Sequence, residues 1–205
     1  TQADVGGLLK MSPQTKPLMV IAPESESVLG ENNLTPGQYI PVQAGVDMNY
    51  NGKRNLRLWP LKYYDALCKK IKKTCPHLKI VQLGGVFNPA LTIKNTDLNL
   101  SGQTTFDELK ILLKHSRLHI DGDCGMVHIN HCLMGKSAVF FGQTLPAFLG
   151  YPENINLKAP GVCPLWCEWV QNTWAEKCVC GHTEPPCMTQ LTPDFVFDKI
   201  KPHLT

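Results

Sequence analysis

The segment 117–145 carries the residues best placed to do chemistry. It begins with a hydrophobic run that predicts a strand ending at Ile120, and a tight, glycine-rich turn, 121–125, follows. Apolar residues then recur at helical spacing, and a second apolar strand, 138–141, ends at Gly142. The helical positions are Met126, Ile129, Leu133 and Met134. The segment is therefore expected to form a strand, a turn, a helix and a second strand.

Such a turn offers an anion-binding site where the helix begins. The first N–H groups of a helix lack partners, and the helix dipole places positive charge beside them. We expect the N–H groups of Cys124, Gly125 and Met126 to face the ligand. Gly125 lets a ligand approach the backbone closely, and Asp123 can cap the helix or accept from a ligand hydroxyl. The imidazole ring of His128 is expected to lie beside the same anion-binding site.

The longer pattern resembles a known family. Asp-x-Gly-x-x-His, followed further along by Phe-Gly-x-Thr, is similar to the donor-site signature of glycosyltransferase family 9, the lipopolysaccharide heptosyltransferases. In this chain the signature falls on Asp123, Gly125, His128, Phe141, Gly142 and Thr144. The resemblance implies that these residues bind a nucleotide-sugar donor.

The resemblance extends over residues 18–200. Residues 57–60 are similar to the family's basic-x-Trp-Pro segment, which opens the first helix of the donor-binding domain. Residues 79–84 resemble the strand that follows. Residues 100–109 resemble the family's Leu-x-Gly-Lys-Thr-Ser…Glu-Leu stretch, with Gln103 where lysine is common.

Family 9 enzymes are built from two Rossmann-like halves that face a cleft, the GT-B arrangement. The resemblance implies that this chain is the C-terminal, nucleotide-sugar-binding half, over residues 18–205, after an N-terminal extension or linker at 1–17. In the family, the acceptor site and the proposed general base belong to the N-terminal half. We therefore expect no catalytic residue in this chain, and no transfer without the missing acceptor-binding domain.

The implied function is inverting transfer of a sugar, heptose from ADP-heptose, in bacterial surface-glycan or lipopolysaccharide assembly. The acceptor is a glycan, a lipid or a protein. Charge develops on the leaving phosphate during transfer, and fixed donors stabilise it efficiently. Arg57 occupies the family's basic position, and its guanidinium can grip phosphate oxygens with two hydrogen bonds. The alternative for Arg57 is an ordinary surface arginine.

Composition and charge agree with a soluble globular chain of 205 residues, 43% hydrophobic and 18% charged. The formal net charge of +3 includes no basic run dense enough to indicate nucleic-acid binding. The longest apolar stretches are strand-sized, so no transmembrane segment is expected, and 1–7 lacks the features of a signal peptide. We expect a bacterial cytoplasmic protein. The lysine cluster 69–73 is expected to be a solvated helix face, with attraction to the inner membrane as the alternative.

The order of elements along the chain alternates strands with helices. Strands are predicted at 18–22, 39–42 and 79–83, in addition to the pair in 117–142. Helices are predicted from Pro60 to Lys73, from the capping box of Thr105 and Glu108 to Leu113, and from Pro193 to about Pro202. This alternation predicts an α/β fold with a mostly parallel, Rossmann-like sheet and helices on both faces.

Five of the nine cysteines fall in residues 160–188, which we call the cysteine-rich segment. Without a secretory signal, a metal is a natural use for clustered thiolates, and free thiols or disulfides are the alternatives. We select four ligands for one structural zinc or iron ion, because Cys180 lies too close to Cys178 for both to face one ion. The four are Cys163, Cys167, Cys178 and Cys187. The resemblance supports a metal here, since autotransporter heptosyltransferases carry a four-cysteine iron-binding finger with different spacings, although transfer itself needs no cofactor.

Three other hypotheses remain open. Cys124 at a helix N-terminus, with His128 or His131 as base, is the arrangement of a Cys-His hydrolase. A non-catalytic module that binds a nucleotide or a metal and mediates assembly is a second. A second metal centre is a third, although its residues need not share a face. Its candidate ligands are His115, His119, Asp121 and His131.

Overall fold

A six-stranded sheet forms the centre of the protein. The computed structural model describes residues 19–21, 23–44, 56–85, 91–163, 167–170, 172–173 and 176–205. The strands are β1 Tyr39–Val42, β2 Lys79–Gln82, β3 Leu98–Asn99, β4 His119–Gly122, β5 Ser137–Phe141 and β6 Ile155–Lys158. They lie in the order β3-β2-β1-β4-β5-β6, and every neighbouring pair is parallel. The predicted Rossmann-like parallel sheet is confirmed, and its strand order reverses between β1 and β4.

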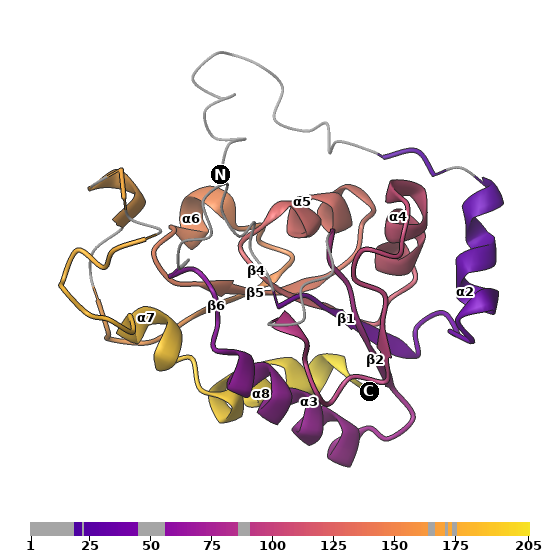
Figure 1. Ribbon diagram of the computed structural model, residues 1–205, viewed down its shortest axis with the longest axis horizontal. Helices are drawn as coiled ribbons and strands as arrows, with labels where there is room; N and C mark the ends of the chain where they lie inside the picture. The colour runs from indigo at the N-terminus through magenta and orange to yellow at the C-terminus, as the bar shows by residue number, and fades with distance from the viewer. Residues whose placement is uncertain are drawn as a thin grey trace.

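Helices cover both faces of this sheet, as the alternation predicted. Figure 1 shows α3 and α8 on one face and α4, α5 and α6 on the other. The helices are η1 Pro23–Glu26, α2 Ser27–Glu31, α3 Leu61–Thr74, α4 Phe106–Lys114, α5 Gly125–Cys132, α6 Pro146–Leu149, η3 Cys167–Trp169, α7 Pro186–Thr189, α8 Pro193–Ile200 and η4 Lys201–His203. Within the described ranges, no helix combines the length and the apolar character needed to span a bilayer.

The core has two layers because side chains alternate between the faces of each strand. Ile40, Ile80 and Ile120 point to the α3 and α8 side and belong to one buried cluster. Tyr39 and Val81, their neighbours along the strands, belong to the cluster under α4. All five residues are 0% exposed, so both faces of the sheet are buried from solvent at these positions. Burial on both faces is what a parallel sheet requires.

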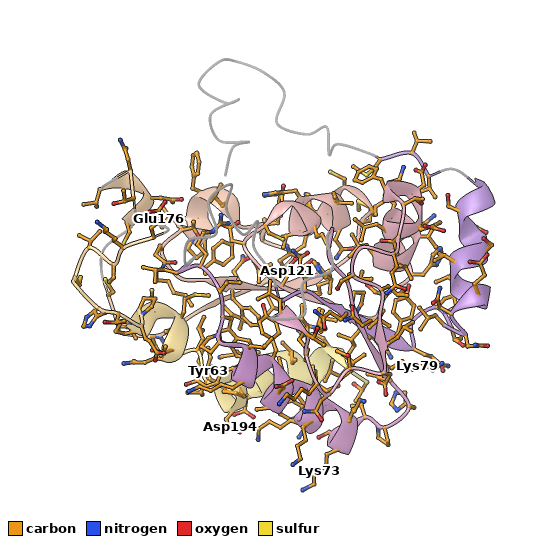
Figure 2. All side chains as sticks on the ribbon, viewed as in Figure 1. Tyr63, Lys73, Lys79, Asp121, Glu176 and Asp194 are labelled. Carbon is orange, nitrogen blue, oxygen red and sulfur yellow. The ribbon has the colours of Figure 1, made fainter. Side chains whose placement is uncertain are left out.

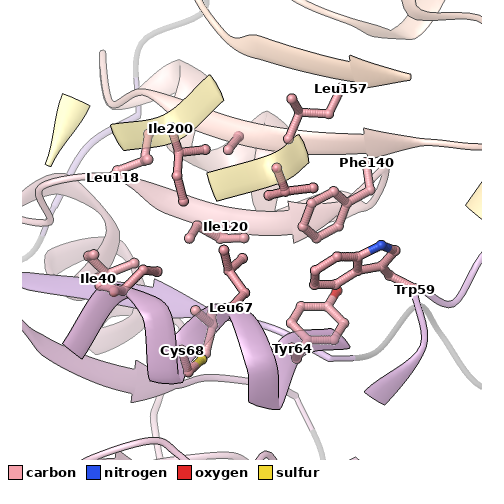
Figure 3. Packing of buried hydrophobic residues seen from close by; sticks show 14 of the residues in the cluster. Ile40, Trp59, Tyr64, Leu67, Cys68, Leu118, Ile120, Phe140, Leu157 and Ile200 are labelled. Atoms are coloured by element: carbon pink, nitrogen blue, oxygen red, sulfur yellow. The ribbon is translucent and has the colours of Figure 1, made fainter. Parts of the chain in front are cut away.

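An aromatic cluster anchors the start of α3 to the sheet. Trp59 stacks on Phe140 of β5 with ring centroids 4.4 Å apart, and its edge contacts Tyr64 at 4.8 Å (Figure 3). The indole Nε1–H of Trp59 donates to the carbonyl of Leu191 at 2.7 Å. The segment before α3 is therefore fixed relative to β5 and to the chain that precedes α8.

Local signals in the sequence place several elements correctly. α3 begins at Leu61, one residue later than predicted, with Pro60 as its N-cap, and it buries an apolar stripe of four residues. The capping box of α4 is confirmed: Glu108 N donates to Thr105 Oγ1 at 3.3 Å, and Thr105 N donates to Glu108 Oε2 at 2.6 Å. α8 begins at Pro193 as predicted, with Thr192 as its N-cap. α8 ends at Ile200, and the 3-10 helix η4 follows it directly.

Other expectations were wrong in detail. β4 runs two residues further than predicted, so Asp121 and Gly122 belong to the strand and the turn is shorter. Residues 19–21 form no strand, and Lys110 Nζ donates to the carbonyl of Val20 at 2.6 Å. Residues 18 and 22, and the extension 1–17, lie outside the described residues. Met134 is 64% exposed because α5 ends before it and its φ of 63° turns the chain away.

Two lysines of the cluster on α3 form ion pairs. Lys70 pairs with Asp194 of α8, and Lys72 Nζ lies 2.7 Å from Asp97 Oδ1. These lysines are half-exposed, as expected for a solvated helix face. The pairing also connects α3 to α8 and to the segment before β3.

Candidate functional site

The reversal of strand order creates a crevice at the carboxyl ends of β1 and β4. Open α/β sheets bind ligands at such a point, because the connections leave the two strands in opposite directions. Gln43 follows β1, and its backbone N–H donates to the carbonyl of Ile120 in β4 at 3.1 Å. Cys124, which follows β4, places its Sγ 4.0 Å from Gln43 Oε1. The turn singled out in the sequence therefore lies at this crevice.

The turn begins α5 without a side-chain cap. Cys124 is the N-cap, with an extended backbone, and its side chain makes no cap hydrogen bond. The prediction that Asp123 caps the helix was wrong, because Asp123 lies one residue earlier and its carboxylate faces Arg57. Gly125 is exposed, and a Cβ at this position would meet none of the described residues within 4 Å. Met126 is buried in the core under α4, so only its backbone faces the crevice.

Arg57 and Asp123 meet at this turn although they are far apart in the sequence. Arg57 Nη2 donates to the backbone carbonyl of Asp123 and lies 3.5 Å from its Oδ2. The Arg57 side chain is 26% exposed and that of Asp123 is 8% exposed. A guanidinium has five N–H donors in a planar fork, a geometry that suits phosphate oxygens. The structure thus brings a cation to the N-terminus of α5, as the phosphate-binding prediction requires.

The position of Arg57 depends on its neighbours in the chain. The carbonyl of Leu56 accepts a hydrogen bond from Gln143 Nε2 at 2.9 Å. On the other side, Trp59 is held by the carbonyl of Leu191. Gln143 is 2% exposed and lies just after β5. The sequence did not single out Gln143, because it is the variable position in Phe-Gly-x-Thr and only the fold shows its partner.

His128 lies one turn into α5 and is oriented by an aromatic neighbour. Its Nδ1 is 2.8 Å from the hydroxyl of Tyr151. The ring of His131 stacks on Tyr151, with centroids 3.6 Å apart and an angle of 10°. A tyrosine hydroxyl is neutral near pH 7, and burial raises the pKa of Tyr151 further, so this hydroxyl can donate to His128. No motif pointed to Tyr151, which lies in the loop before β6.

Gly142 and Thr144 follow β5 and are both buried. A Cβ on Gly142 would lie 2.5 Å from Met188 Sδ and 3.5 Å from Cys187 Sγ. The glycine therefore lets α7 approach the end of β5. The structure supplies this packing reason for Gly142, and its predicted contact with the donor stays a prediction, as does that of Thr144.

A buried polar group lies directly beneath the turn. Asp121 is fully buried in β4; its Oδ1 accepts from Gly122 N at 2.7 Å, and its Oδ2 accepts from the Cys124 thiol at 2.8 Å. The same Oδ2 is 3.3 Å from His119 Nε2, and His119 Nδ1 is 3.1 Å from Ser137 Oγ. Figure 2 shows Asp121 near the middle of the sheet. Burial raises the pKa of Asp121, and the nearby His119 opposes this effect.

This environment contradicts the hypothesis of a Cys-His hydrolase. Burial, followed by the charge of Asp121, raises the pKa of the Cys124 thiol well above its ordinary value. A catalytic thiol needs the opposite shift. The proposed bases are engaged elsewhere, since His128 and His131 both contact Tyr151. Cys124 is thus a hydrogen-bond donor within the fold.

The cysteine-rich segment gathers around one cavity of about 110 Å³. Six soft or imidazole side chains line it: Cys163, Cys167, Cys178, Cys180, His182 and Cys187. The four predicted ligands are therefore brought together, but Cys180, expected to face away, lines the same cavity. All nine cysteines are free thiols. Burial raises the pKa of Cys187 to about 11.

Metal-ligand geometry is a stricter condition than a shared cavity. In the part of the chain that the structure describes, no three or more His, Cys, Asp or Glu side chains are placed to hold one ion. This holds for the cysteine-rich segment and for the second centre considered from the sequence. In that second set, His119 and Asp121 pair beneath the turn, while His131 stacks on Tyr151.

Comparisons with known proteins agree with this fold. Residues 49–178 match the family described as glycosyltransferase family 9 (heptosyltransferase). No curated protein matches the sequence. A family 9 glycosyl transferase from Veillonella parvula is similar, with a TM-score of 0.68 and 13% identity over 98% of this chain and 58% of that one.

Two further solved structures show the same architecture. E. coli ADP-heptose lipopolysaccharide heptosyltransferase II has a TM-score of 0.64 and 15% identity over 92% of this chain and 53% of its own. The dodecameric iron-containing heptosyltransferase TibC, in complex with ADP-D-beta-D-heptose, has a TM-score of 0.62 and 12% identity over 99% of this chain and 53% of its own. The chain spans about half the length of these solved relatives.

Proposed function

Because the chain belongs to glycosyltransferase family 9, we propose that residues 18–205 form the nucleotide-sugar-binding half of a GT-B glycosyltransferase. The observation that carries the proposal is the meeting of Arg57 and Asp123 at the N-terminus of α5. This contact joins two segments singled out separately in the sequence. It lies at the crevice where open α/β sheets bind nucleotides.

The residues of the crevice have distinct roles in this proposal. The donor pyrophosphate lies at the start of α5, where the N–H groups of Cys124, Gly125 and Met126 and the helix dipole favour negative charge. Arg57 contributes the side-chain cation that stabilises charge on the leaving phosphate. Asp123 accepts from a sugar or ribose hydroxyl.

Three more residues complete the proposed donor site. His128, oriented by Tyr151, lies along the helix from the phosphates. Gly142 and Thr144 close the site at the end of β5. None of these groups is a general base, so the roles proposed for this chain are binding and charge stabilisation, without a catalytic residue.

We propose ADP-heptose as the donor and inverting transfer as the reaction. Support comes from the solved relatives, one described as an ADP-heptose heptosyltransferase and one holding ADP-D-beta-D-heptose. Transfer then needs an acceptor-binding N-terminal half, with a glycan, lipid or protein acceptor. The proposed setting is bacterial surface-glycan or lipopolysaccharide assembly in the cytoplasm, at the inner membrane.

Nucleotide-dependent thermal stabilisation tests this proposal. A ligand at a hundredfold excess over its Kd stabilises the native state by about 2.7 kcal/mol. For a chain of this size that corresponds to roughly 5–10 °C in Tm. ADP is expected to give this shift, and UDP and GDP in the same screen test the base. Arg57→Ala is expected to weaken binding roughly tenfold or more, the effect of one charged hydrogen bond, and Asp123→Ala is expected to reduce the shift as well.

Arg117→Ala is the matched control. Arg117 is exposed and precedes β4, so it lies at the amino edge of the sheet, opposite the crevice. Its substitution should leave the nucleotide shift unchanged. Equal losses in Arg57→Ala and Arg117→Ala, or no shift with any nucleotide, would contradict the donor site.

We also propose that Cys163, Cys167, Cys178 and Cys187 hold one structural zinc or iron ion. Four thiolates are a donor set that suits these metals, and the side chains already line one cavity. Gln143 lines the same cavity, and among the described residues its buried Oε1 has no hydrogen-bond partner. TibC is described as iron-containing. The thiols would have to draw together, because their present positions do not form a ligand set.

Elemental analysis of protein purified without added metal tests the second proposal. Close to one zinc or iron per chain is expected. Cys178→Ser should remove the metal and destabilise the cysteine-rich segment, and Cys180→Ser is the control that should keep it. Metal-free protein with titratable thiols would contradict the proposal. Oligomers that dissociate with a chelator, together with no nucleotide binding, would favour an assembly module instead.

A further inference from the structure

Asp121 is a buried carboxylate that the proposed donor chemistry does not use. It is fully buried in β4, two residues before Asp123. Burying a carboxyl group is costly unless its oxygens have partners. Both oxygens are occupied, Oδ1 by the N–H of Gly122 and Oδ2 by the thiol of Cys124. The partners of Asp121 therefore belong to the same turn that begins α5.

The contact with Cys124 has a consequence for the helix N-terminus. An N-cap side chain ordinarily accepts a hydrogen bond from the N–H of the second or third helical residue. The Cys124 side chain makes no such bond. Its thiol instead donates a hydrogen bond to Asp121 Oδ2 at 2.8 Å. The thiol is still close enough to the first-turn N–H groups of α5 for those of Met126 and Val127 to lower its pKa, and the hydrogen bond to Asp121 draws it away from them. First-turn N–H groups are the ones expected to bind a phosphate.

The turn is held from two sides. Arg57 contacts the carbonyl of Asp123 from the crevice, and Asp121 holds Cys124 from the sheet. His119 lies 3.3 Å from Asp121 and contacts Ser137 at the start of β5. The carboxylate is thus fixed in orientation by β4 and β5, which the sheet holds rigidly.

We propose that Asp121 is a positioning residue for the donor-phosphate site. By holding the Cys124 thiol beneath the turn, it keeps the first-turn N–H groups of α5 available to the pyrophosphate. This inference rests on the proposed function, since it assigns a role within the same site. Asp121 itself does not touch the donor.

A double-mutant cycle between Asp121 and Cys124 tests the inference. Asp121→Asn keeps an acceptor for Gly122 N–H but replaces the Oδ2 acceptor by an amide donor. The released thiol can then turn to the helix N-terminus and compete with the phosphate. Because an N-cap interaction changes an equilibrium by about fivefold, the Kd for ADP is expected to rise about fivefold. In a Cys124→Ala background no side chain remains to compete, so Asp121→Asn should change the Kd less than twofold.

Thiol reactivity measured at unchanged Tm provides a readout that a merely structural role would not give. In the unsubstituted chain, burial and the charge of Asp121 raise the pKa of the Cys124 thiol. Asp121→Asn removes that charge and frees the thiol, so alkylation of Cys124 by iodoacetamide should accelerate. Peptide mass spectrometry separates Cys124 from the other cysteines. Added ADP should slow the reaction by covering the turn.

The outcomes are distinct. An equal rise of the Kd in both backgrounds, with a matching fall of Tm, would show a merely structural role and overturn the inference. An unchanged Kd in Asp121→Asn would overturn it while leaving the donor site intact. If the unsubstituted chain binds no nucleotide, the proposed function fails, and the inference fails with it. Arg117→Ala, which changes an exposed residue outside this contact chain, is the control expected to leave ADP affinity within twofold of the unsubstituted chain.

Discussion

Replacing Gly142 by alanine should reveal why this position at the end of β5 is a glycine. The new methyl carbon would lie 2.5 Å from Met188 Sδ and 2.9 Å from its Cγ. Ordinary contact between such atoms needs about 3.5–4.0 Å. Met188 is only 1% exposed, and the cavity of about 200 Å³ that it lines is the space into which its side chain would have to move. Either the methionine or the whole of α7 must shift.

The magnitude follows from the cost of overpacking a filled core. Inserting one methyl group in such a site costs about 1–3 kcal/mol. In a chain of about 200 residues, 1 kcal/mol corresponds to roughly 2–4 °C in Tm. Thermal unfolding followed by circular dichroism is therefore expected to show Gly142→Ala melting roughly 2–12 °C below the unsubstituted chain.

Two further variants make this prediction strict. Gly30, in α2, has open space around its Cα, so Gly30→Ala should raise stability by roughly 0.5–1 kcal/mol. Met188→Ala creates a cavity that the new methyl group in Gly142→Ala can partly fill. The double mutant should therefore be less destabilised than the sum of the single mutants by about 1 kcal/mol or more. Strict additivity, or an unchanged Tm in Gly142→Ala, would refute the packing explanation.

Three other substitutions test separate parts of the fold. Thr105→Ala removes the capping box and should cost about 1 kcal/mol in urea unfolding; no change would mean that the exposed cap is already solvated. Tyr39→Phe leaves the carbonyl of Leu112, which the hydroxyl contacts at 2.8 Å, without that donor, and should cost about 1–3 kcal/mol; an unchanged urea midpoint would contradict this. Burial raises the pKa of Asp121, so its contribution to stability is complete below the unfolded pKa near 4 and is lost as the pH rises through the folded pKa. Asp121→Asn should therefore gain stability relative to the unsubstituted chain as the pH rises from about 4; parallel pH profiles of the two urea midpoints would contradict this.

Local and periodic signals predicted most of the architecture. The apolar stripe of α3 and the capping box of α4 depend on residues three and four apart, which the chain itself brings together. The parallel sheet followed from the alternation of strands and helices. Short elements gave no such signal. β3 has two residues, and β6, at the edge of the sheet, buries only Leu157 of its four residues.

The candidate site was only partly predictable, because its key contacts are non-local. Arg57 and Asp123 were each singled out, and the fold brings them together. Asp121 was assigned to the turn because an Asp-Gly pair usually marks one, yet it lies in β4. Its partner His119 was considered from the sequence only as a metal ligand, and Tyr151, which contacts His128, carries no motif. His119 and Asp121 meet because residues two apart share one face of β4, and Tyr151 reaches His128 from a loop that returns to α5.

The short helix α7 links the two parts of the molecule to which chemistry was assigned. Cys187 lines the cavity of the cysteine-rich segment, and the next residue, Met188, lines a second cavity of about 200 Å³ beside Leu56 and Trp59. Gly142 permits this helix to approach β5. A change in the cysteine-rich segment that moved α7 would therefore also affect the packing of Leu56 and Trp59, which lie on either side of Arg57. The Phe-Gly-x-Thr segment thus has a structural reason to occur beside the proposed donor site, since its glycine sets the distance between α7 and the sheet.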